Sequence, residues 1–296
     1  MKFFNVVLTS NNINKCIRAV NSFNDDVTVI CNTLKNNYYD QLCEQKQLSS
    51  CNIIKTQSDG TVATGKQSVL HEFLKTDSDY LILVDGDDFL GPEGTKPIKD
   101  LLTTNPVDLV WGTETILFPN FDNFLSNDQY HLVNWQLISP EFLVLGQSSK
   151  NNMLRKHKVS ALKLYRLIKE ILGQEQYSWH RNICFSRKSA EILQFENSVG
   201  HEEFRAALQL KQHTYKKELS SCLLIHDMLY IYDQLDVNSQ QGFATVFKNF
   251  NNIVDLKEAL FNGFSEEDIN QLKTFKLPQV TIPSYDISQY VKSRIL

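Results

Sequence analysis

The chain lacks any apolar run that is long enough to cross a bilayer. Its first apolar stretch, at residues 3–8, is also too short for a secretory signal, and no small-residue cleavage site follows it. The six cysteines form no Cys-x-x-Cys pair and no zinc-binding spacing. These absences predict a protein without a membrane partner, located in the cytoplasm, whose cysteines are reduced and buried.

Basic residues are also fewer than acidic residues. The 30 Lys and Arg residues are outnumbered by 34 Asp and Glu residues, which leaves a net charge of −4. This balance excludes a surface that is basic all over for nucleic acid, although it allows a local basic patch. No internal repeat and no low-complexity linker divides the 296 residues. The length therefore suits one large domain or two small ones.

Strands and helices are expected to alternate along the first ninety residues. Short apolar runs predict strands at 3–8, 27–31, 52–55 and 80–84. Helical periodicity between these runs predicts helices at 12–23, 38–48 and 66–74, with a polar loop at 56–65. Repeated strand–helix alternation is typical of a doubly wound sheet. We therefore predict an α/β fold with a mostly parallel central sheet flanked by helices.

The pattern loosens after residue 92. We expect helices at 98–103, 153–172 and 202–210, strands at 108–111 and 182–186, and a strand within 223–232. Residues 112–148 are interpreted as irregular, residues 243–275 as a polar helical tail, and the end of the chain as extended. The predicted 153–172 helix has a basic face that includes Lys156, Lys158, Lys163 and Arg166. Such a face is either solvated surface or a set of phosphate contacts.

An acidic cluster directly follows the strand expected at 80–84. Asp85, Asp87 and Asp88 repel one another unless a cation or a set of donors lies between them. They fall at the carboxyl end of a strand, where open α/β sheets bind their ligands. Carboxylates on a short turn suit Mg²⁺ or Mn²⁺ that bridges to a substrate phosphate. The same Asp-x-Asp pattern at 77–79 precedes the strand and is interpreted as an ordinary turn.

A P-loop is one alternative interpretation of this region. Residues 60–66 have the spacing Gly-x4-Gly-Lys, and the 80–85 stretch could then supply the magnesium-organising Asp of an NTPase or kinase. Against it, Gln67 stands where a P-loop has a Ser or Thr hydroxyl for the metal, and Ser68 comes one residue late. The loop also follows the third strand instead of the first.

The first hundred residues resemble the nucleotide-binding half of a GT-A glycosyltransferase of the family-2 type. In that family polar residues after the first two strands contact the nucleoside, and a loop before the metal strand approaches the diphosphate. By this resemblance the donor-binding residues are Thr9, Asn11, Asn32, Asp59, Gly60, Lys66 and Asp85. Lys66 replaces the Arg of the family, which keeps a cation near the diphosphate but loses its bidentate geometry.

The resemblance also assigns the metal site. Asp85-Gly86-Asp87 matches the Asp-x-Asp motif of the family, so Asp85 is expected near ribose and metal and Asp87 as the direct ligand. Asp88 is an alternative ligand of the metal. His226 is a further candidate, because His is a metal ligand in several other GT-A families.

The second half of the sequence resembles the family through less specific motifs. The Glu202-Glu203 pair stands where the family has Glu-Asp at the start of a helix, which places Glu203 in the position of the catalytic base and Glu202 beside it. This match implies an inverting, single-displacement reaction. Without the resemblance the pair would be ordinary acidic residues at a helix start. Asp233 and Asp236 replace an Arg and a His of the family, so the roles of those two positions do not transfer.

Together the matches cover residues 3–240. They imply a GT-A domain at 1–240, with a nucleotide-sugar-binding half at 1–100 and an acceptor half at 101–240, followed by a tail at 241–296. They also imply a metal-dependent hexosyltransferase whose donor is a nucleotide-diphosphate sugar, with UDP favoured.

The acceptor is left open between a glycan or small molecule and a hydroxymethylated base in DNA. The second acceptor arises because the chain is similar to small phage-encoded glycosyltransferases, which act in the host cytoplasm. A non-catalytic sugar-nucleotide-binding module is a further alternative. Such a module would be expected to lose the acidic motif, which is intact in this sequence.

Overall fold

A central sheet of eight strands organises the chain. The computed structural model describes residues 1–112, 114–119, 130–134, 181–196, 202–226, 229–233, 258 and 261–282. The strands of the sheet are β1 (Phe3–Thr9), β2 (Thr28–Cys31), β3 (Asn52–Lys55), β4 (Tyr80–Asp85), β6 (Leu109–Gly112), β9 (Arg181–Ser186), β10 (Ser221–Ile225) and β12 (Gln279–Thr281). Their order is β12-β10-β6-β9-β4-β1-β2-β3. The predicted helix at 153–172, with its basic face, lies outside the described residues, as does Asp236.

Most of this sheet is parallel. Among the described pairings only those of β9, with β4 on one side and β6 on the other, are antiparallel. The register places Leu8 beside Asp85 and Thr9 beside Cys31. The carboxyl ends of β1, β2 and β4 therefore meet at one edge of the sheet. The prediction of a mostly parallel α/β sheet is confirmed.

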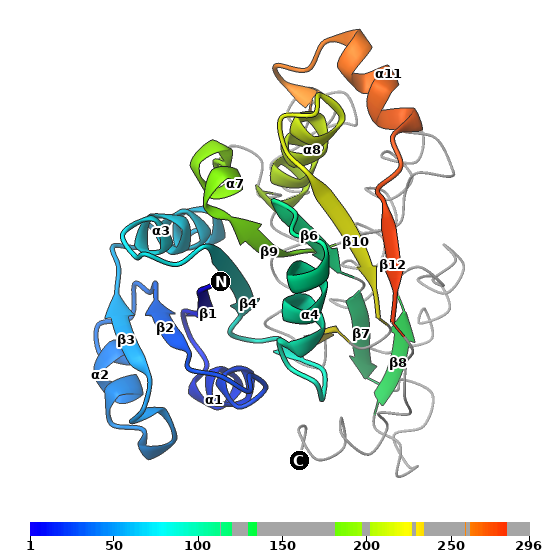
Figure 1. The fold of residues 1–296 in the computed structure, drawn as a ribbon. Helices are drawn as coiled ribbons and strands as arrows, with labels where there is room; N and C mark the ends of the chain where they lie inside the picture. The colour runs from blue at the N-terminus through cyan, green and yellow to red at the C-terminus, as the bar shows by residue number, and fades with distance from the viewer. Residues whose placement is uncertain are drawn as a thin grey trace.

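Helices cover both faces of the sheet (Figure 1). On one face, α1 (Ile13–Val20), α2 (Tyr38–Cys43) and α4 (Lys96–Thr104) bury their apolar residues in a core that includes Val7 and Val84. On the other face, α3 (Val62–Leu74), α7 (Arg187–Ile192) and α8 (Glu202–Tyr215) pack in a second core around Phe73 and Trp111. The result is a three-layer arrangement that fixes the ends of the strands relative to one another.

A second sheet stands beside the first. Its strands are β5 (Phe89–Leu90), β7 (Glu114–Pro119), β8 (Tyr130–Asn134) and β11 (Tyr230–Asp233), in the order β5-β11-β7-β8. The expectation that residues 112–148 are irregular is wrong at β7 and β8. The reason is that β7 pairs with β11, more than a hundred residues later, so its local pattern carries little of the signal. The expected strand within 223–232 is two strands, β10 and β11.

Helix α3 begins earlier than the predicted residue 66. The Thr61 side chain caps the helix by accepting from the backbone N–H of Thr64, and Gly65 lies inside it. The backbone N–H of Gly65 donates to the Thr61 carbonyl at 3.4 Å. Most of the 60–66 segment is therefore helical and does not form the open loop of N–H groups that a P-loop wraps around phosphate. Similarly, the helix predicted at 38–48 is divided into α2 and a 3₁₀ turn, η1 (Lys46–Leu48).

The C-terminal segment is part of the fold. Strand β12 pairs in parallel with β10 and extends the central sheet. Helix α11 (Glu266–Thr274) packs on α8, and just after α8 the Lys216 ammonium lies 3.0 Å from an oxygen of Asp268. A segment beyond residue 240 thus contributes a strand to the central sheet. The three residues of β12 are exposed and include a single apolar residue, which is too short a run to indicate a strand of the central sheet.

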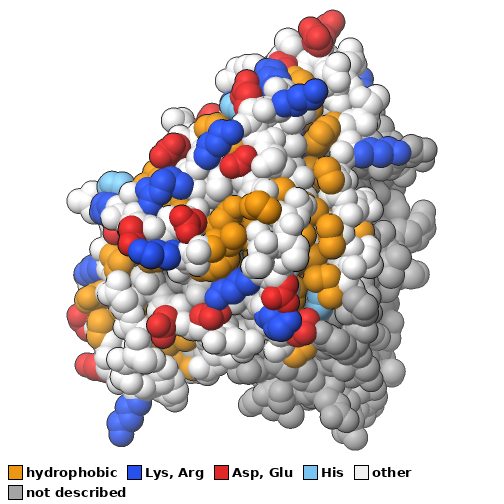
Figure 2. Space-filling model, in the orientation of Figure 1, with side chains coloured by type: hydrophobic (Ala, Val, Ile, Leu, Met, Phe, Trp, Pro, Cys, Tyr) orange, Lys and Arg blue, Asp and Glu red, His pale blue; other side chains and the backbone are white. Residues whose placement is uncertain are grey.

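The described residues bear on three sequence predictions: the state of the cysteines, the lack of a membrane-crossing helix and the distribution of surface charge. All six cysteines are free; Cys16, Cys31, Cys184 and Cys222 are buried, whereas Cys43 is exposed and Cys51 partly exposed. None of the described helices has the length and apolarity to cross a membrane. On the face seen in Figure 2, basic and acidic side chains of the described residues alternate, with no large area of one sign.

Candidate active site

A cleft of about 620 Å³ opens where β1, β2 and β4 end. The turns that follow these strands supply one part of its lining, helix α3 a second, and the start of β9 and of α8 a third. The predicted site residues that line it are Thr9, Asn11, Asn32, Gly60, Lys66, Asp85, Asp87, Asp88 and Glu203. Residues separated by up to two hundred positions in the sequence are thus collected in one cleft, at the edge where open α/β sheets bind ligands.

Three other predicted residues are placed differently. Asp59 does not line the cleft; its carboxylate accepts from the Thr61 backbone N–H at 2.9 Å and so shapes the turn into α3. His226 is buried and its Nε2 lies 3.2 Å from a carboxylate oxygen of Glu93, so the structure does not bring it to the acidic turn. Glu202 opens α8, but its side chain lies outside the description.

Asp85 lies between two cations. Its Oδ2 is 3.6 Å from the ammonium of Lys66 and also forms an ion pair with the guanidinium of Arg181. Burial favours the neutral carboxyl, but the charges of Lys66 and Arg181 outweigh it and lower the pKa of Asp85 below its usual value. Asp85 is therefore ionised at neutral pH.

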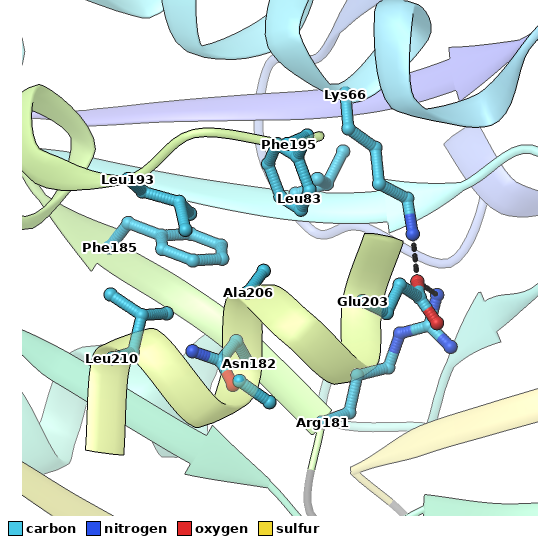
Figure 3. Close-up of a pocket in the computed structure, with 11 residues that line it drawn as sticks. Lys66, Leu83, Arg181, Asn182, Phe185, Leu193, Phe195, Glu203, Ala206 and Leu210 are labelled. Atoms are coloured by element: carbon cyan, nitrogen blue, oxygen red, sulfur yellow. Dashed lines mark hydrogen bonds and ion pairs between the residues drawn. The ribbon is translucent and has the colours of Figure 1, made fainter. Parts of the chain in front are cut away.

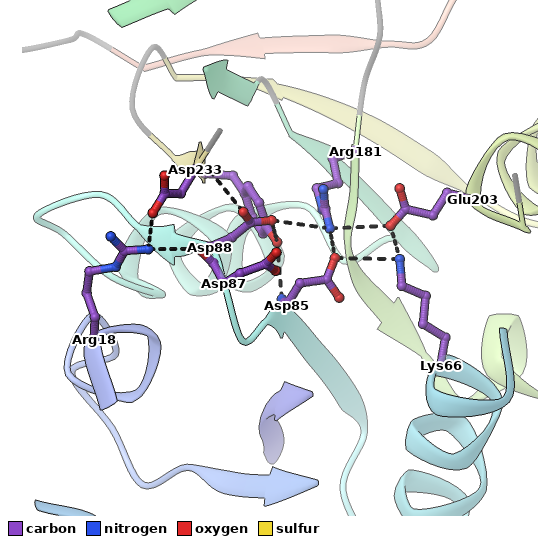
Figure 4. A network of polar contacts seen from close by, with 9 residues as sticks. Arg18, Lys66, Asp85, Asp87, Asp88, Arg181, Glu203 and Asp233 are labelled. Atoms are coloured by element: carbon purple, nitrogen blue, oxygen red, sulfur yellow. Dashed lines mark hydrogen bonds and ion pairs between the residues drawn. The ribbon is translucent and has the colours of Figure 1, made fainter. Parts of the chain in front are cut away.

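Glu203 joins the same network from the first turn of α8 (Figure 4). Its Oε1 pairs with the Lys66 ammonium and lies 3.3 Å from Nη2 of Arg181. Lys66 is only 3% exposed. A buried cation at this position needs negative partners, and Asp85 and Glu203 supply them. The two carboxylates are thus held across the cleft by two shared cations.

Arg181 is a site residue that sequence reasoning missed. It is the first residue of β9, and within the described residues the antiparallel insertion of β9 between β4 and β6 is what carries it to the cleft. A second arginine, Arg187, begins α7 directly after β9. Arg187 instead donates to the backbone carbonyls of Leu74 and Ser78, which ties the start of α7 to the end of α3 and the segment before β4. The residues around these two arginines in the sequence do not distinguish their roles.

Asp88 is held by the second sheet. The hydroxyl of Tyr230 donates to its Oδ2 at 2.8 Å, and the backbone N–H of Asp233 donates to its Oδ1 at 3.0 Å. The side chain is fully buried. Both carboxylate oxygens are therefore engaged by β11, which makes Asp88 an anchor for the acidic turn and the least available of the three acids for a metal.

Asp87 is placed differently from its neighbours. Its backbone carbonyl accepts from Nη2 of Arg18 at 2.7 Å, which fixes the turn. No hydrogen bond or ion pair of its carboxylate is found among the described residues, although the side chain lines the cleft. Burial, followed by the charge of Asp85, raises the pKa of Asp87. A cation bound in the cleft would remove this penalty, and carboxylate oxygens are suitable ligands for Mg²⁺ or Mn²⁺.

Gly86 lets the acidic turn approach β1 closely. Its backbone N–H donates to the Leu8 carbonyl at 2.7 Å, and a Cβ added at Gly86 would lie 2.7 Å from that same oxygen. We expect Gly86→Ala to displace the turn and to lower the free energy of unfolding by about 1–3 kcal/mol. Thermal unfolding followed by circular dichroism measures this loss.

Gly65→Ala is the matched control for Gly86→Ala. Its added Cβ would meet a methyl group of Leu8 at 3.3 Å, and that side chain can move. Because Ala is favoured over Gly inside a helix by up to about 1 kcal/mol, we expect this variant to unfold at the wild-type temperature or above it. Equal stability of Gly86→Ala and the wild type would contradict the close approach.

Asp233 supports the acidic turn through Arg18, which also donates to the Asp87 carbonyl. Its Oδ2 accepts from Nη2 of Arg18 at 2.6 Å and lies 3.3 Å from the Lys15 ammonium. It is 1% exposed. We expect Asp233→Asn to remove the buried negative charge that faces Arg18 and Lys15 and to lower the free energy of unfolding by about 3–5 kcal/mol, measured by urea denaturation.

The control for Asp233 is Asp100, which pairs with Lys96 at 2.5 Å on the surface of α4. Both of these side chains are more than half exposed, so Asp100→Asn is expected to change the stability by less than about 0.5 kcal/mol. Equal losses in the two variants would mean that the Arg18–Asp233 contact contributes no more than a surface ion pair.

Comparison with known proteins finds similarity in structure only. No known family and no curated protein matches the sequence. Glucosyl-3-phosphoglycerate synthase from Mycobacterium tuberculosis, solved with Mn²⁺, UDP and phosphoglyceric acid, matches 88% of this chain and 78% of its own at 10% identity, with a TM-score of 0.50. TarS from S. aureus matches 92% of this chain at 14% identity with a TM-score of 0.47.

The extent of these matches differs. The chain spans 42% of the longer TarS structure and 70% of TarS 1–349 solved with UDP-GlcNAc, where the TM-score is again 0.47. The fold assignment rests on the likeness to the synthase, on the mostly parallel sheet with helices on both faces, and on the cleft at its carboxyl edge. On these grounds the chain has the GT-A fold of nucleotide-sugar glycosyltransferases.

Proposed function

We propose that the chain is a metal-dependent, inverting glycosyltransferase that moves a hexose from a UDP-sugar to a hydroxyl acceptor. One observation carries the proposal: a single cleft collects the Asp87 carboxylate, the buried cation Lys66 and the Glu203 carboxylate that pairs with it. A diphosphate with a divalent cation complements such an arrangement, because it supplies negative charge to Lys66 and a metal to Asp87.

The nucleoside end of the cleft supports a uridine donor. The amide nitrogen of Asn32 donates to the Thr56 hydroxyl at 2.8 Å and to the Gln57 carbonyl at 2.9 Å. These bonds fix the amide, whose oxygen lies close to Gly65, and both residues line the cleft. An amide oxygen suits the N–H of a uracil ring. Thr9, whose hydroxyl is paired with that of Tyr38 at 2.6 Å, lies at the same end.

The residues present fit a divalent cation. Asp87 would be the principal ligand and Asp85 would approach it with the oxygen that does not face Arg181. Asp88 and His226 would take no direct part, because β11 and Glu93 engage them. When bound, the cation would stabilise the negative charge that develops on the leaving diphosphate. Lys66 and Arg181, the cations that pair with Asp85 and Glu203 in the cleft, would share that task.

Glu203 is proposed as the base. The acceptor oxygen forms a bond to the anomeric carbon, the bond from that carbon to the diphosphate breaks, and the acceptor proton passes to Glu203. Before the donor binds, Lys66 and Arg181 hold Glu203 in ion pairs. Because the diphosphate competes for the same cations, we infer that donor binding loosens these pairs and that the donor binds before the acceptor.

A glycan or a small hydroxyl compound is the acceptor that we propose. The DNA alternative depends on the predicted basic helix at 153–172, which lies outside the described residues. The mixture of charges on the face in Figure 2 provides no phosphate-binding stripe there. A gel shift with hydroxymethylated duplex that weakens with salt would overturn this choice and support DNA as the acceptor.

The test of the proposed function is turnover of a panel of nucleotide sugars with Mn²⁺, measured as release of the nucleoside diphosphate. We expect UDP-sugars to be consumed in preference to GDP-sugars and ATP. Turnover of ATP without turnover of any nucleotide sugar would overturn the proposal. Tight binding of a UDP-sugar without turnover, even with a broad acceptor panel, would instead support a non-catalytic binding module.

A further inference from the structure

A small pocket continues from the cleft on the far side of the Lys66–Glu203 pair (Figure 3). It has a volume of about 40 Å³ and lies between the sheet and α8. Lys66, Arg181 and Glu203 line both the cleft and this pocket, so they mark the boundary between the two. The rest of the wall is mainly apolar: Leu83, Phe185, Leu193, Phe195, Ala206, Ala207 and Leu210.

Asn182 is the polar exception in this apolar wall. It follows Arg181 on β9, and its amide lies among Ala206 and Leu210 in Figure 3. The amide nitrogen is buried and has no hydrogen-bond partner among the described residues. A buried donor without a partner is unfavourable, so the site is complementary to a ligand that offers an acceptor at this position.

We propose that this pocket binds the acylamino group, such as an acetamido group, of a sugar substrate. The proposal rests on the proposed function, because it assigns part of a sugar to a space next to the reacting centre. The methyl group would pack on the apolar wall and the acyl oxygen would accept from the Asn182 amide.

Size and polarity both favour this group. A single water needs about 10–15 Å³ measured in the same way, so the pocket has room for a few heavy atoms and excludes a sugar ring. A hydroxyl group alone would leave the apolar wall without contact. A plain alkyl group would leave the amide of Asn182 without a partner. An acetamido group satisfies both.

Either substrate could carry the group, because Glu203 lies where donor and acceptor meet. Two pairs of ligands distinguish these sources, each pair differing by one acetamido group. For the donor, UDP-GlcNAc is compared with UDP-glucose by calorimetric titration with Mn²⁺. For the acceptor, N-acetylglucosamine is compared with glucose in the presence of UDP and Mn²⁺. UDP alone is titrated in every case.

We expect the acetamido ligand of one pair to bind at least about tenfold more tightly than its hydroxyl counterpart, from one buried methyl group and one hydrogen bond. Two variants change the pocket separately: Ala206→Leu fills it and Asn182→Leu removes the amide. In both, the preference should fall to less than about threefold. The measured quantity is the ratio of the two ligand affinities within a pair. Each affinity is first divided by the affinity of the same variant for UDP alone.

The possible results separate the acylamino proposal from the proposed function. A preference in the donor pair or in the acceptor pair that both variants abolish supports the pocket and identifies its source. Equal binding within both pairs, or a preference that survives in both variants, overturns the acylamino proposal while UDP binding leaves the proposed function intact. Failure of the wild type to bind UDP at all would count against the proposed function itself.

Discussion

Asp87→Asn is expected to reduce the kcat/KM for a UDP-sugar by about three orders of magnitude and to remove its dependence on Mn²⁺. The substitution keeps the size of the side chain and removes the carboxylate, for which no partner is found among the described residues. Because the main-chain contact from Arg18 goes to the Asp87 carbonyl, the turn itself should stay in place. The measurement is steady-state release of UDP across a range of Mn²⁺ concentrations.

Asp77→Asn is the matched control for this substitution. It alters the first Asp of the other Asp-x-Asp pattern, on the surface before β4, where the side chain is 80% exposed and pairs with Lys2. We expect its turnover to equal that of the wild type. If Asp87→Asn retained full activity, or if excess chelator left the wild type active, the metal role of Asp87 would be contradicted.

Glu203→Gln is expected to reduce transfer by about two to four orders of magnitude without loss of donor affinity. The amide cannot accept the acceptor proton. Since Lys66 and Arg181 would lose a competing carboxylate, the affinity for UDP should stay equal to the wild type or increase. Single-turnover transfer and calorimetric titration of UDP measure the two effects separately.

Glu202→Gln tests the register of this assignment. The neighbouring residue opens the same helix and is expected to keep most of its activity. An inactive Glu202→Gln with a nearly normal Glu203→Gln would move the base by one position. If both variants transferred sugar normally, the proposal of an inverting reaction with a carboxylate base on α8 would fail.

The sequence predicted the parts of the fold that depend on local pattern. The strands at 52–55 and 80–84 lie within one residue of β3 and β4, because short apolar runs between polar turns are informative over a few residues. The acidic motif was placed at the end of β4 for the same reason. The start of α3 was predicted too late because Gly60 and Gly65 suggested a loop, whereas the Thr61 cap and the packing of Gly65 against Leu8 favour a helix.

The parts of the site that the sequence could not predict depend on distant contacts. Asp85, Asp87 and Asp88 look alike in the sequence, and their different surroundings arise from Arg181, Arg18 and β11. Those partners lie between 69 and 145 positions away. Periodicity and spacing carry no information on such pairs, so the anchoring of Asp88 and the contribution of Arg181 became apparent only in three dimensions.

The most direct test of the central claim is a calorimetric titration of UDP into the wild type with and without Mn²⁺, repeated with Asp87→Asn. If the cleft at the end of β4 is a nucleotide-sugar site, the wild type should bind UDP at a one-to-one ratio and at least about tenfold more tightly with Mn²⁺. Asp87→Asn should lose that gain. Absence of UDP binding to the wild type, or an equal gain from Mn²⁺ in the variant, would contradict the account.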